Sequence, residues 1–226
     1  MMMTMIKKWT AVLFFLFFPL VTFAQEKDFG IWYGISLRHK VLKNLDVAFS
    51  PVLRTFKNAS KIDQEFLEAG LEYKFNKHLS TMGSYRLTNS IEDDARFHIQ
   101  HKLFIDLKGS MALSAFNINC RMRFQSRVKT YIENDKDKIP DYTGRIKLKA
   151  SFKTPNFPVD PYIYAETFSP LFIKKERVIE KSRLAAGIQL SIANRHSVEV
   201  EYIFQRDYLP NISDINVISI VYSIEL

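Results

Sequence analysis

Charged side chains recur at every second position in several stretches of this 226-residue chain. The basic candidates for a site come from two neighbouring stretches and are Arg121, Arg123, Arg127, Arg145, Lys147 and Lys149. The acidic candidates come from three other stretches and are Glu68, Glu72, Glu166, Glu199 and Glu201. Arginine and lysine could bind the oxygens of a small anionic solute, and the carboxylates could instead hold the same cations in ion pairs.

A period of two in polar and apolar residues is typical of β-strands, because successive side chains point to opposite faces. The clearest example is 64–75, where Leu67 and Leu71 face one way and Glu68 and Glu72 face the other. The charged candidates therefore lie on the polar faces of strands. We expect the strands over 113–128 and 142–152 to be neighbours, so that their basic faces form one wall.

Roughly eleven such segments follow one another after residue 25, most of them about ten residues or longer. About ten residues is the length that a tilted strand needs to cross a bilayer, whereas strands in soluble proteins average about five or six. Short turns, at 43–44, 76–78, 108–110 and 193–196 with a longer one at 153–161, alternate with more polar loops. These polar loops are 57–63, 88–94, 129–140, 170–180 and 207–214. We predict an all-β protein, with a single antiparallel transmembrane β-barrel of about 10–12 strands over residues 25–226.

The last stretch, 215–226, sets an apolar face against a more polar one. The apolar face consists of Ile218, Ile220, Tyr222, Ile224 and Leu226. We expect this face to meet lipid and the strand to close the barrel against the first strand of the wall. Single-chain bacterial barrels have even strand numbers. Eleven segments therefore leave three alternatives: the count is off by one, residues 25–29 thread through the lumen, or the first segment is not part of the wall.

The N-terminus has the pattern of a secretory signal peptide. Lys7 and Lys8 precede an apolar run over 9–21, and small residues flank a cut between Ala24 and Gln25. The run of about 13 residues is shorter than the roughly 20 that a spanning helix needs. We therefore expect a cleaved signal at 1–24, export, and a location in the outer membrane.

The formal net charge is +8. In an exported chain, anionic lipid headgroups and lipopolysaccharide are better partners for this charge than nucleic acid. The barrel-assembly machinery is a further expected partner. The single cysteine, Cys120, excludes a disulfide within the chain.

A charged lumen in a narrow barrel has two interpretations, because buried charge must be paired or hydrated. It is either a plug of salt bridges or a binding site or pore for a small anionic solute.

His98 and His101 lie on opposite faces of one strand, which suits neither a metal site nor a catalytic pair. No nucleophile motif, glycine-rich phosphate loop or paired cysteines are present, so we predict no catalytic, cofactor or metal residues. An outer-membrane enzyme acting on lipid and a soluble periplasmic binding sandwich remain as alternatives.

Several segments resemble a family of exported Gram-negative barrel proteins, domain of unknown function 2490. They are DFGIWYGISLRHKVLKNLDVAFSPVLRTF, RFHIQHKLFIDL, CRMRFQSRV, PYIYAETF and SRLAAGIQLSI. The resemblance covers about residues 28–226 and includes the charged positions Arg54, Arg96, Arg121, Arg145, Glu166 and Arg183. It implies an outer-membrane barrel and supplies no activity.

A barrel of this kind should fractionate with the outer membrane and migrate on gels in a heat-modifiable way, because a closed barrel satisfies its whole backbone internally. Membrane fractionation and electrophoresis of boiled and unboiled samples measure these two properties. Recovery as a soluble periplasmic protein would contradict the prediction.

Overall fold

The computed structural model describes residues 28–91, 96–129, 140–155, 157–172, 179–209 and 211–226. The predicted signal peptide at 1–24 lies outside the described residues, as does most of the predicted loop at 129–140. The described part contains no helix that is long and apolar enough to cross a membrane.

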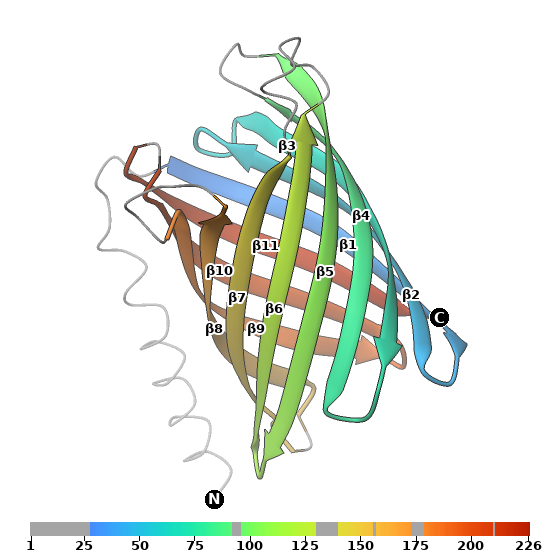
Figure 1. The fold of residues 1–226 in the computed structure, drawn as a ribbon. Coiled ribbons are helices and arrows are strands. Elements are labelled where there is room, and N and C mark those ends of the chain that lie inside the picture. Colours follow the sequence, from blue (N-terminus) through green and yellow to red (C-terminus); the bar gives the residue numbers. More distant parts are fainter. Residues whose placement is uncertain (1–27, 92–95, 130–139, 156, 173–178, 210) are drawn as a thin grey trace, which may run out of the picture.

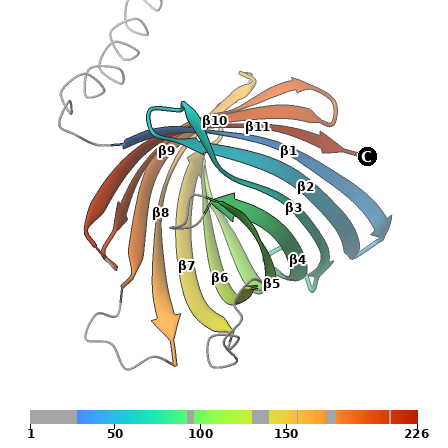
Figure 2. The same cartoon turned by 90° about the horizontal axis from the view of Figure 1, so that it is seen from above.

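The described residues form eleven strands in one closed barrel (Figure 1). The strands are β1 (Asp28–Leu42), β2 (Leu45–Phe56), β3 (Lys61–Lys74), β4 (Leu79–Ile91), β5 (Phe97–Leu113), β6 (Phe116–Lys129), β7 (Asp141–Phe152), β8 (Val159–Leu171), β9 (Lys181–Ala193), β10 (His196–Asp207) and β11 (Ser213–Glu225). Seen from above, they follow one another around the molecule in chain order (Figure 2). The prediction of a single barrel of about 10–12 long strands is confirmed.

The connections gather at two ends of the barrel. The last residues of β2, β4, β6, β8 and β10 lie at one end, called here the long-loop end, beside the first residues of the strands that follow them. Connections 43–44, 75–78, 114–115, 153–158 and 194–195 lie at the other, called the short-turn end. The strands run further than their polar ends suggest, so the loops are shorter than predicted.

β1 and β11 close the barrel as a parallel pair. Ten successive antiparallel pairs give the first and last of eleven strands the same direction, so closure requires one parallel ladder. That ladder runs from Asp28↔Ile215 to Arg38↔Glu225. It ends where the Leu226 amide donates to the Arg38 carbonyl at 2.7 Å. The barrel therefore has an odd number of strands and one parallel pair, and β1 belongs to the wall. The count of eleven segments was right, and the expectation of an even strand number was wrong.

The outer surface of the barrel is apolar and its interior is polar. Large apolar side chains are exposed on the outward faces, among them Leu103, Ile105, Ile146, Leu148, Ile163 and Leu184. Charged side chains are buried on the inward faces, among them Asp46, Glu72, Asp106, Arg123, Glu166 and Arg183. A soluble sandwich would bury the first set and expose the second, so the alternative of a soluble periplasmic sandwich is wrong.

The last strand follows the same rule. Ile218, Ile220 and Leu226 are exposed on the outside, as predicted, whereas Val217 and Ser219 are buried inside.

One side of the interior is filled by an apolar cluster from β8 to β11. It consists of Tyr162, Tyr164, Ala185, Ile203 and Val217, with Trp32 and Ile215 packed against it. The inward positions of β8, whose faces the sequence leaves open, therefore carry the aromatic residues. The ring of Tyr162 lies over its partner Gly187, where a Cβ atom would come within 2.7 Å of the ring. A side chain larger than hydrogen at Gly187 would displace this ring.

Two local features interrupt the regular pattern of strands and turns. The predicted turn at 108–110 is wrong, because Gly109 lies inside the ladders of β5 with both β4 and β6. The chain reverses at 114–115 instead, where Ser114 has the positive φ of 50° that this turn uses. The β1–β2 ladder is interrupted at Pro51, which has no backbone N–H to donate, since no pair lies between Gly34↔Val52 and Leu37↔Phe49.

The parallel closure predicts which positions can be cross-linked. In a Cys120→Ser background, Ser36→Cys and Ser223→Cys should be joined by a short bifunctional thiol reagent, because these residues are direct partners in the β1–β11 ladder. Ser36→Cys with Ser213→Cys is the matched control, since Ser213 lies at the opposite end of β11. Gel mobility under denaturing conditions measures the link. Equal yields for both pairs, or no link at 36–223, would contradict this closure.

Candidate functional site

The predicted basic wall lies on β6 and β7, which are neighbours in the sheet. Their register pairs Arg121 with Lys147 and Arg123 with Arg145. Like charges directly opposite one another are unfavourable, so these pairs need acidic groups from elsewhere in the interior. The acidic candidates face them from other strands: Glu68 and Glu72 from β3, Glu166 from β8, and Glu199 and Glu201 from β10.

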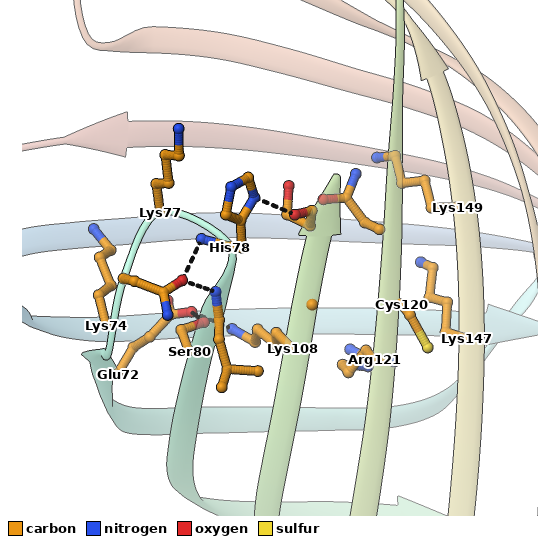
Figure 3. Close-up of a pocket in the computed structure, with 15 residues that line it drawn as sticks. Glu72, Lys74, Lys77, His78, Ser80, Lys108, Cys120, Arg121, Lys147 and Lys149 are labelled. Carbon is orange, nitrogen blue, oxygen red and sulfur yellow. Dashed lines mark hydrogen bonds and ion pairs between the residues drawn. The ribbon is translucent and has the colours of Figure 1, made fainter. Parts of the chain in front are cut away.

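A cationic cavity of about 400 Å³ lies at the short-turn end (Figure 3). Its cationic lining consists of Lys74, Lys77, Lys108, Arg121, Lys147 and Lys149. Glu72 is the one acidic side chain in the described lining. Its carboxylate accepts hydrogen bonds from Lys108 Nζ at 3.0 Å and Ser80 Oγ at 2.8 Å, and it also pairs with Arg38. Lys74, Arg121 and Lys149 pair with Asp46, Glu166 and Glu199, which lie outside the lining. The positive excess of this cavity therefore comes from Lys77 and Lys147.

A second cavity, of about 280 Å³, lies at the long-loop end. Its cationic lining consists of Arg54, Arg86, Lys102, Arg127, Arg145, Lys181 and Arg183. Only Asp141 and Glu180 are acidic in the described lining, and Gln64, Gln125 and Thr143 add neutral polar groups. This cavity is therefore also positive.

An alternating stack of arginine and aromatic side chains crosses the interior from β1 to β6. Each strand contributes one residue, in the order Trp32, Arg54, Phe66, Arg86, Phe104 and Arg123. The arginine Cζ atoms lie 3.9–5.0 Å from the neighbouring ring centroids. Such cation–π contacts cover the flat faces of a guanidinium group and leave its N–H edges available.

The stack continues around the barrel. Arg145 and Arg183 lie over Phe168 at 4.3 and 4.8 Å, and Arg183 also lies 4.9 Å from Trp32, where the stack began. We call these nine residues the arginine–aromatic belt. Packing against rings holds the guanidinium groups in place, so the belt presents preorganised hydrogen-bond donors.

Three carboxylates balance most of the belt. Asp106 accepts two hydrogen bonds from Arg123, at 2.5 and 2.7 Å. Glu68 accepts from Arg86 Nε at 2.7 Å. Bidentate and charge-assisted contacts of this kind are the strong ones.

Glu166 is the third of these carboxylates. Its Oε1 atom lies 2.6 Å from Arg121 and 2.8 Å from Arg145, and its Oε2 atom lies 3.7 Å from Arg183. Arg54 is the belt arginine with no ion pair in the described residues. Its Nε atom is buried and has no hydrogen-bond partner there.

The other sequence candidates lie nearer the ends of the lumen or against rings. Lys149 pairs with Glu199 at 3.1 Å, and Arg127 pairs with Asp141 at 2.6 Å. Glu201 accepts a hydrogen bond from the Tyr162 hydroxyl at 2.9 Å. Lys147 lies 3.4 Å from the ring centroid of Tyr164.

Sequence reasoning missed the belt as a unit. It did not place Arg54, Arg86 or Arg183 in the site, nor the rings that hold them. The available signal was an aromatic residue on an otherwise polar strand face, as at Phe66 beside Glu68 and at Phe104 beside Asp106. An aromatic ring on the face that points into the lumen indicates that it packs against a cationic side chain there.

The arrangement suits anion binding through fixed guanidinium and ammonium groups. Within the part of the chain that the structure describes, no three His, Cys, Asp or Glu side chains are grouped so that they could hold a metal ion.

The architecture is similar to that of solved outer-membrane proteins. The NanC porin matches with a TM-score of 0.54 at 14% identity, over 87% of this chain and 97% of the porin. LpxR from Salmonella typhimurium matches with a TM-score of 0.51 at 10% identity, over 85% of this chain and 87% of that one. The β domain of the Bordetella autotransporter BrkA matches with a TM-score of 0.50 at 10% identity, over 82% and 85%. At these identities the likeness shows the fold, that of an outer-membrane-type β-barrel.

A search of curated proteins finds no match. The family model described as a protein of unknown function, DUF2490, matches residues 29–216, which is most of the chain. The chain therefore belongs to the DUF2490 family.

Proposed function

We propose that this protein is an outer-membrane barrel whose lumen is a narrow, anion-selective passage for small solutes. The observation that carries this proposal is that a positive cavity lies at each end of the lumen. Most of the lining cations pair with carboxylates, several of which lie outside the linings. Lys77 and Lys147 in the first cavity, and Arg54 and Lys102 in the second, keep the positive excess. Charged walls of low dielectric constant concentrate ions of the opposite sign and repel those of the same sign.

In our proposal the passage is narrowest between the two cavities, at Glu166. Its Oε1 atom contacts both Arg121, which lines the short-turn cavity, and Arg145, which lines the long-loop cavity. The carboxylate thus occupies the place that a passing anion would need, between arginines of the two cavities. In our proposal Glu166 is the internal counter-ion of the constriction, and an anion crosses by exchanging with it for the same donors.

The surroundings fit a place in the outer membrane. The outward faces are apolar and suit lipid. The chain stays basic after the loss of Lys7 and Lys8 with the proposed signal peptide, and a basic chain suits anionic headgroups and lipopolysaccharide. We include in the proposal export through a signal peptide at 1–24 and insertion by the barrel-assembly machinery.

The refolded protein should give conductance steps in a planar bilayer, because the cavities lead toward one constriction from both ends. Under a potassium chloride gradient, the reversal potential should have the sign of chloride preference. A neutral salt of a large organic anion gives the size cut-off. Cation preference would contradict the proposal, and silence at all potentials would favour a lumen plugged by its salt bridges.

Replacing the internal counter-ion should change both selectivity and stability. Glu166→Gln removes the negative charge from the constriction, so the reversal potential should shift further toward anion preference. It also leaves buried arginines unbalanced, which should lower the free energy of unfolding by about 3–5 kcal/mol.

Glu199→Gln is the matched control, because it breaks the more exposed pair with Lys149. This change should cost about 0–1 kcal/mol. Urea unfolding in lipid vesicles measures the difference. Equal effects of the two substitutions on selectivity would remove Glu166 from its proposed role.

A further inference from the structure

The cations of the long-loop cavity differ in whether they have a counter-charge. Arg86 pairs with Glu68, Arg127 with Asp141, and Lys181 with Asp207. Arg145 and Arg183 share Glu166. Among the described residues, these pairs leave Arg54 and Lys102 without an ion pair of their own. Asp63 acts on Arg54 electrostatically, but from beyond ion-pair distance. The two unbalanced cations line the same cavity.

Lys102 lies at the centre of a row of like charges. The register places Arg86 of β4 on one side of it and Arg127 of β6 on the other. The acids of this row, Glu68 and Asp141, lie one strand further out on each side. Like charges directly opposite one another in a sheet are destabilising. They need hydration by water or a counter-charge from an anion.

Arg54 is held ready for a ligand. Its guanidinium Cζ atom lies 3.9 Å from the ring centroid of Trp32 and 5.0 Å from that of Phe66. Rings on its faces leave its N–H edges as the groups available for binding, and its buried Nε has no partner. A fixed fork of this kind matches the oxygens of a carboxylate or phosphate.

From these observations we propose that the long-loop cavity is a binding site for a small dianion held between Arg54 and Lys102. The two unbalanced cations set the charge of the ligand, and the cavity volume of about 280 Å³ limits its size. That volume lies just below the range of about 300–1,000 Å³ for small-molecule sites, so only a small ligand fits. Phosphate-type groups and short dicarboxylates share the required chemistry. The inference rests on the proposed function, since it names the solute class that the lumen would select.

The test uses the refolded full chain in detergent micelles and titration calorimetry with inorganic phosphate, succinate and acetate at pH 8. Saturable binding of phosphate, of succinate or of both, at least about tenfold tighter than acetate, is expected, because a second charge-assisted contact is lost with the monoanion. Binding of phosphate alone would assign the site to phosphate-type groups, and binding of succinate alone would assign it to dicarboxylates. No preference over acetate would overturn the inference.

The variants Arg54→Gln and Lys102→Gln should each weaken dianion binding by about tenfold or more. Both should fold, as shown by heat-modifiable migration, because each removes an unbalanced charge from the interior. Lys77→Gln is the matched control, since it removes the same charge from the lining of the other cavity. An equal loss in this control would overturn the inference. Anion-selective conductance without dianion binding would defeat the inference and leave the proposed function standing, whereas cation selectivity would defeat the proposed function.

Discussion

The structure depends on one constraint: the charges enclosed by a narrow barrel must be balanced inside it. Eleven strands enclose too little space for each inward arginine and lysine to keep a full hydration shell, so the cations need carboxylates, rings or mobile anions. Asp106, Glu68 and Glu166 supply the carboxylates, and Trp32 and Phe168 are among the rings. Where these partners are missing, the interior retains a positive charge that a solute can meet.

The arginine–aromatic belt explains how this charge is kept in place inside the barrel. An arginine that is bound only by carboxylates is neutralised, whereas one that stacks on a ring keeps its charge and its donor edges. Arg86 and Arg123 have both kinds of partner, and Arg54 has rings alone. The belt therefore combines a rigid interior with one unbalanced position. In our proposal the two interpretations of the charged faces, a salt-bridged plug and an anion site, apply to different parts of the same lumen.

Much of the fold could be predicted from the sequence, because each strand has one lipid face and one lumen face that alternate with a period of two. This pattern fixes the strand type, the approximate number, the outward direction of Ile218 and Ile220, and the neighbouring positions of β6 and β7. The parallel closure of β1 on β11 follows from the odd strand number, and the sequence pattern left that number open between ten and twelve. The partners of each charge depend on register across strands far apart in the chain, as for Arg121 and Glu166. The belt was hidden for the same reason.

A crystal structure of the protein soaked in sodium bromide would test the central claim most directly, because anomalous scattering locates bromide without reference to the protein atoms. The account predicts bromide inside the lumen, in the long-loop cavity beside Arg54 and Lys102 and in the short-turn cavity near Lys147. Bromide confined to the outer surface of the barrel, with both cavities free of it, would contradict the claim that this lumen is built to receive anions.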